Sequence, residues 1–252
     1  MIDNDIVKII QDFDDTANAP YFHTAVSHKV KRYLQNLANV TVKEDHTAIY
    51  AKYTRGTTNR SIIIDTHLDH PAFVSIGRKR ALAIGSIGNK SLVNTLNAQC
   101  PVPIKLYDAG GNFQSCGQIN AFTFDSRVLT VTYSADVASL EDDINLQLLF
   151  DLPFTHTSDE VHMRSADNLS VTGIAIRLLD YLSSNQIDAT VEVVFTKLEE
   201  IKQISASIIA RKNKTPFGHF DENTYIFCLE AATVGTNDVV RHIAERNITY
   251  TD

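Results

Sequence analysis

Two adjacent carboxylates, Glu199 and Glu200, follow an apolar, β-branched run that begins at Val191. A run of this kind predicts a buried strand. The pair would then lie at the carboxyl edge of a sheet, where open α/β folds hold their sites. Past the end of a strand the backbone can direct both side chains toward one ligand, so one carboxylate could bind a metal ion while the other moves a proton.

Further acids and an imidazole stand at the same kind of position elsewhere in the chain. They follow the strand-like runs 61–66 and 224–229, or precede a segment at 171–184 whose apolar residues recur at helical spacing: His67, Asp69, Asp167 and Glu230. Imidazole and carboxylate groups gathered in this way are the ligands of a borderline divalent ion such as zinc. The sequence therefore predicts a metal site at one edge of a sheet.

The bulk properties limit the class of protein. The 252 residues are 44% hydrophobic and 21% charged, which is typical of a globular protein with an ample core. A formal net charge of −7 argues against nucleic acid or an anionic membrane as the main partner. The start of the chain lacks a signal-peptide pattern, no apolar run could span a bilayer, and the three cysteines lack CxxC spacing. We therefore expect a cytoplasmic protein with reduced thiols.

The pattern along the chain changes twice. Residues 1–75 are expected to form helix, helix, strand and strand, and helix–strand alternation resumes after residue 159. Between them, short strand-like pieces alternate with turns, which predicts an inserted β-barrel-like module at 76–158. The predicted fold class is α/β: a mixed sheet flanked by helices, formed by 1–75 and 159–252, with the β-rich domain inserted between them.

The order of these motifs resembles a known family. It resembles the co-catalytic metallo-aminopeptidases of the MH clan, and most of all the glutamyl-aminopeptidase-like group whose members assemble into tetrahedral particles. The resemblance runs from about residue 5 to residue 252 and is carried by these features: His67-x-Asp69, Phe73, the β-rich insertion with its 83–88 start, Ala166-Asp167-Asn168, Glu199-Glu200 and Glu230.

The resemblance implies roles for the matched residues. His67 and Glu230 would hold one divalent ion, Asp167 would bridge it to a second, and Glu200 would bind the second ion. Zinc or cobalt is the expected metal. The family's chemistry also implies that Glu199 is the general base and that Asp69 forms a hydrogen bond with the ring of His67. Peptide substrates and a homo-oligomeric assembly are implied in the same way.

The chain departs from the family pattern after Glu230. The family places a further metal-binding histidine well downstream, whereas His242 comes too soon to match it. The resemblance therefore predicts a C-terminally incomplete chain or a decayed relative, with one complete metal position and possible binding of only one ion. Lys202 and Ser205 stand where relatives usually have glycines.

Three functions remain open at this point. The first is a metal-dependent aminopeptidase that removes N-terminal residues from peptides with water activated by two metal ions. The second is a catalytically impaired relative that acts as an assembly or regulatory subunit. The third is a deacylase of small N-acyl amino acids, because the same metal chemistry serves any amide.

Overall fold

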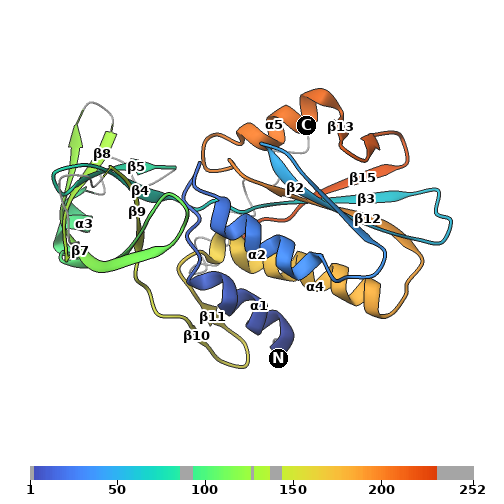
Figure 1. The fold of residues 1–252 in the computed structure, drawn as a ribbon, viewed down its shortest axis with the longest axis horizontal. Coiled ribbons are helices and arrows are strands. Elements are labelled where there is room, and N and C mark those ends of the chain that lie inside the picture. The colour runs from blue at the N-terminus through green and yellow to red at the C-terminus, as the bar shows by residue number, and fades with distance from the viewer. Residues whose placement is uncertain (1–2, 86–92, 126–127, 137–143, 232–252) are drawn as a thin grey trace, which may run out of the picture.

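The computed structural model describes residues 3–85, 93–125, 128–136 and 144–231. Figure 1 shows an α/β part beside a β-barrel, with the barrel formed by the middle of the chain. The predicted fold class, a mixed sheet flanked by helices with an inserted barrel, is confirmed.

The central sheet brings the ends of three strands to one edge. Its order is β1 (Val40–Glu44), β2 (Ala48–Arg55), β12 (Ala189–Thr196), β3 (Ser61–His67) and β15 (Thr224–Cys228). The strands β12, β3 and β15 are parallel, with Thr196 opposite His67 and Cys228 opposite Asp65. Because their carboxyl ends coincide, the residues that follow each strand gather at the same place.

Helices cover both faces of this sheet (Figure 1). On one face lie α1 (Asn4–Asp14), α2 (Thr24–Leu34) and α4 (Val171–Ser184), and on the other lies α5 (Ile204–Lys212). The helix predicted at 171–184 is confirmed, and its Ala175 and Leu179 are fully buried in the larger core. On the opposite face, Ile209 of α5 packs against Ile63 and Val194. Burial on both faces explains the continuously apolar character of the central strands.

The barrel closes on six antiparallel strands in the order β4-β5-β8-β7-β6-β9. They are β4 (Ala72–Ile76), β5 (Arg80–Ile84), β6 (Val102–Tyr107), β7 (Phe113–Asp125), β8 (Val128–Ala135) and β9 (Ile144–Phe150), with helix α3 (Val93–Ala98) between β5 and β6. Phe73 lies in the barrel core, edge-on to Phe122 and Phe150. The barrel thus begins before residue 76, and the division of domains at 75/76 and 158/159 remains a prediction.

Shorter elements complete the described chain. They are the hairpins β10 (Thr155–His156) with β11 (Val161–His162) and β13 (Lys214–Thr215) with β14 (Gly218–His219), and a π-helical turn, η3 (Ala166–Ser170), that leads into α4. Asp167 therefore stands just before a helix, as predicted. Within the described ranges, no helix has the length and apolar character needed to cross a membrane. His242 and part of the 83–88 segment lie outside those ranges.

His23, at the start of α2, makes stability depend on pH. Burial, together with the charge of Lys197, lowers the pKa of His23 from 6.5 to about 4. Its Nδ1 atom is buried and has no hydrogen-bond partner among the described residues. A histidine whose pKa is lower in the folded chain contributes full stability above pH 6.5, and this stability is lost as the pH falls toward 4. Between pH 7.5 and 5 we expect a loss of about 2 kcal/mol from this residue.

Urea unfolding of the metal-free chain at both pH values measures this effect. His23→Gln cannot titrate, so its free energy of unfolding should fall by about 2 kcal/mol less than that of the unchanged chain over the same interval. Equal losses in the two proteins would contradict the assignment.

Candidate metal centre

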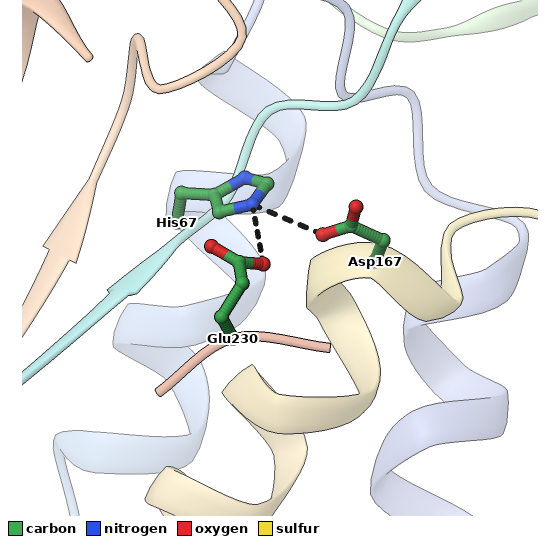
Figure 2. Close-up of side chains that lie close together, drawn as sticks. All are labelled: His67, Asp167 and Glu230. Carbon is green, nitrogen blue, oxygen red and sulfur yellow. Dashed lines mark hydrogen bonds and ion pairs between the residues drawn. The ribbon is translucent and has the colours of Figure 1, made fainter. Parts of the chain in front are cut away.

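Three side chains of metal-ligand type meet at the carboxyl edge of the sheet (Figure 2). His67 ends β3, Glu230 follows β15, and Asp167 lies on η3. The His67 Nε2 atom is 3.1 Å from Asp167 Oδ1 and 3.3 Å from Glu230 Oε1. The alignment of parallel strands β3 and β15 brings two of the three together, as the sequence pattern predicts.

One side of the cluster is buried and the other is exposed to solvent. The His67 side chain is 3% exposed, whereas those of Asp167 and Glu230 are 51% and 53% exposed. Glu199 lies at the same edge, with Oε2 3.8 Å from His67 Nε2. A small ion held here would be anchored on one side and open to solvent on the other, where a substrate could approach.

The electrostatics of the cluster favour a cation. Burial alone would lower the pKa of His67, but the hydrogen bond with Asp167 and the charges of Glu230, Asp69 and Glu199 raise it to about 9. Burial and the hydrogen bond with Asp167 raise the pKa of Glu230 to about 7. In the metal-free chain, protons therefore balance the crowded carboxylates. A divalent ion would replace these protons.

Asp69 supports the cluster through two different groups. Its backbone carbonyl accepts the hydrogen bond of His67 Nδ1 at 2.9 Å, while its carboxylate accepts the backbone amides of Glu199 and Glu200 at 3.0 and 3.1 Å. The expected hydrogen bond to the His67 ring is thus made by the main chain of Asp69. The carboxylate, 3.7 Å from Nδ1, instead holds the loop that carries the Glu pair. Burial raises the pKa of Asp69 to about 6, although these amide bonds oppose the shift.

Glu200 does not join the cluster. Among the described residues, only His67, Asp167 and Glu230 form a group whose candidate ligand atoms lie within 4.8 Å of one another. The backbone amide of Glu200 is bound by the Asp69 carboxylate, and its Cβ lies beside Gly85, the residue after β5. The described residues thus form one group of three such ligand atoms, and the role of Glu200 as a ligand of a second ion stays a prediction.

Two residues that the sequence interpretation did not assign to the site connect the ligand-bearing segments. His70 donates a hydrogen bond from Nδ1 to the Asp167 carbonyl at 2.6 Å. Asn168 donates from Nδ2 to the carbonyl of Leu229, the residue before Glu230, at 2.9 Å. Their adjacency to the ligands in sequence was the available signal, since neither residue belongs to a periodic pattern.

The donor set fits a divalent metal ion. One imidazole and two carboxylates are the ligands that zinc accepts, and three protein ligands with an open position are typical of catalytic zinc sites. The Nδ1–H bond to the Asp69 carbonyl fixes the tautomer that leaves Nε2 for a metal, which is the usual support of a metal-binding histidine. The residues present are therefore suited to hold such an ion.

Comparisons with known proteins agree with this fold. No family model matches the sequence, and no curated protein matches it. Solved structures do match. An aminopeptidase from the archaeon Desulfurococcus kamchatkensis is similar with a TM-score of 0.61 and 14% identity, over 83% of this chain and 61% of that one. The Pyrococcus horikoshii TET1 peptidase, which can assemble into a tetrahedron or a large octahedral shell, is similar with a TM-score of 0.66 and 14% identity, over 96% and 82%.

A TET aminopeptidase from a marine sediment Thaumarchaeota archaeon gives a TM-score of 0.68 at 14% identity, over 93% of this chain and 68% of that one. At this identity the likeness defines the fold, and the chain shares the fold of these aminopeptidases. The chain spans 61% of the length of the Desulfurococcus enzyme.

Proposed function

We propose that this chain is a metal-dependent aminopeptidase that hydrolyses the N-terminal peptide bond of short peptides. The observation that carries the proposal is the meeting of His67, Asp167 and Glu230 with the Glu199 carboxylate 3.8 Å from the shared ring nitrogen. The fold shared with archaeal aminopeptidases supports the choice of substrate class.

In this proposal, different residues bind the metal ion and transfer the proton. His67, Asp167 and Glu230 would hold a divalent ion, zinc or cobalt. A bound ion of this kind lowers the pKa of water and stabilises the oxyanion that forms during amide hydrolysis. Glu199 is placed to take a proton from the attacking water and return it to the leaving amine. Asp69 keeps Glu199 in range through its bond to the Glu199 amide.

A form with two ions belongs to the same proposal. Asp167 would bridge the two ions and Glu200 would bind the second, as the resemblance implies. Because the described residues assemble three ligands for the first ion only, we propose that the first ion is bound more tightly.

The proposed setting is cytoplasmic, in keeping with three cysteines that lack paired spacing. The proposed assembly is a homo-oligomer, by analogy with the shells of the Pyrococcus horikoshii peptidase. Light scattering of the purified chain measures the number of chains in the assembly directly.

Profiling of substrates tests the function. The chain, reconstituted with zinc or cobalt, is offered aminoacyl amides with a free amine beside their N-acetyl counterparts. We expect hydrolysis of the free-amine series, its loss on chelation, and its return when metal is restored.

The other outcomes identify the alternatives. Preference for the N-acetyl series would replace the aminopeptidase with a deacylase. Bound metal without turnover on either series, in a defined oligomer, would favour a non-catalytic subunit and contradict the proposal.

A further inference from the structure

Asn18 lies between α1 and α2, far in sequence from every residue of the metal centre, and is fully buried. Its Nδ2 donates to the Leu68 carbonyl at 3.0 Å, and its backbone carbonyl accepts the His70 amide at 2.9 Å. These two bonds bracket Asp69 on both sides. Asn18 therefore holds the main chain of the loop after β3 at two points, and the Leu68 amide is bound as well by the Thr196 carbonyl at 2.8 Å.

The position of Asp69 decides the geometry of two functional groups. Its carbonyl receives the Nδ1–H of His67, which sets the orientation of the ring, and its carboxylate receives the amides of Glu199 and Glu200. A shift of this peptide would move the metal-binding nitrogen and the proposed base together.

The other end of the Asn18 side chain faces the segment that carries Asp167. Asn18 Oδ1 accepts a hydrogen bond from Arg164 Nη1 at 2.9 Å and lies 3.5 Å from the hydroxyl of Ser165. Arg164 also donates to the carbonyls of Thr16 and Asp14, which fixes the loop around Asn18. An amide offers a donor at one end and an acceptor at the other, so both neighbours are satisfied at once.

We infer that Asn18 is a positioning residue for the metal centre, because it fixes the His67 segment and the Asp167 segment relative to each other. The inference rests on the metal site proposed above. Mutation of outer-shell residues that orient metal ligands typically lowers metal affinity by 10–100-fold. Asn18 acts through Asp69 and Arg164 and touches neither the ion nor the substrate.

The test compares two buried amides that lie close together. Gln147 of β9 is also fully buried and bonds the Ala19 amide and the Asp108 carbonyl, but its side chain forms no hydrogen bond with a ligand-bearing segment in the described part of the chain. Gln147→Ala is therefore the matched control for Asn18→Ala. Asn18→Asp keeps the volume and the acceptor for Arg164 but places an oxygen against the Leu68 carbonyl, and it serves if Asn18→Ala does not fold.

One titration of each 252-residue variant measures both consequences of losing Asn18. Titration with Co²⁺, followed by visible absorption, reports affinity and ligand geometry. We expect Asn18→Ala and Asn18→Asp to bind Co²⁺ about 10–100-fold more weakly with an altered spectrum, and Gln147→Ala to match the unchanged chain. Unchanged affinity and spectrum in both Asn18 variants would overturn the inference, as would an equal loss in Gln147→Ala.

Hydrogen exchange in the metal-free chain separates this inference from the metal proposal. Loss of the Asn18 side chain should speed exchange of the amides of Glu199 and Glu200, whereas Gln147→Ala should leave them protected. The His70 amide keeps its main-chain acceptor at residue 18 in every variant. If the unchanged chain bound no Co²⁺, the proposed function would fail. The exchange pattern would then still decide whether Asn18 holds the loop, and unaltered exchange would overturn that role.

Discussion

Glu199→Gln should lower kcat for aminoacyl amides by 10²–10⁴-fold, because a general base contributes about that factor. The amide side chain keeps nearly the volume of the carboxylate but cannot accept the proton of the attacking water. The backbone bond from residue 199 to Asp69 does not involve the side chain, so the loop should keep its position. The metal content per chain should stay unchanged, since Glu199 is not one of the three clustered ligands.

Steady-state kinetics with elemental analysis of the same sample measures this result. Glu222→Gln is the matched control, because Glu222 is an exposed carboxylate in the turn before β15. Retained activity in Glu199→Gln would contradict its role as the base. Loss of metal together with activity would instead make Glu199 a ligand.

His67→Ala should remove tight metal binding and, with it, all metal-dependent hydrolysis. The imidazole nitrogen lies between both carboxylates, so its removal leaves two exposed acids without a buried anchor. When the concentration of the free ion is 100 times its dissociation constant, binding stabilises the folded chain by about 2.7 kcal/mol. The increase in Tm that zinc causes in the unchanged chain should therefore be absent in the variant.

Thermal unfolding with and without zinc measures this effect. His219→Ala is the control, because His219 is exposed on β14 and should retain the full response to zinc. A zinc-induced increase in His67→Ala as large as in the control would place the ion elsewhere in the chain.

The carboxyl edge of the sheet could be predicted because its strands are apolar and parallel. The runs ending at His67 and Cys228 carry their own strand signal, and parallel pairing aligns their ends. The amphipathic pattern of α4 likewise locates Asp167. For these residues, local pattern and global arrangement agree, so sequence alone is informative.

The supporting contacts could not be predicted in the same way. The Asp69 carboxylate could have faced the His67 ring or the amides of the Glu loop, and only the fold decides which. Asn18 and Arg164 meet across loops without periodicity, so their pairing depends on tertiary packing. Sequence patterns report which face an element buries, and they carry no information about such long-range polar contacts.

The sequence indicated in part the unusual backbone of the loop that follows Glu199 and Glu200. Lys202 and Gln203 adopt left-handed backbone angles, with φ values of 59° and 54°. Glycine adopts this conformation without steric cost, so the glycine that the resemblance leads us to expect at position 202 would suit this backbone. The resemblance marks Lys202 and Ser205 as departures; the left-handed backbone bears on Lys202 alone, because Ser205 lies within α5.

The number of metal ions retained per chain tests the central claim most directly. After reconstitution with zinc and removal of free metal, elemental analysis should find one tightly bound ion per chain in the unchanged protein and none in His67→Ala. A second retained ion would mean that Glu200 and a further ligand complete the second position. A chain that retains no ion under these conditions would contradict the proposed metal centre and the aminopeptidase function built on it.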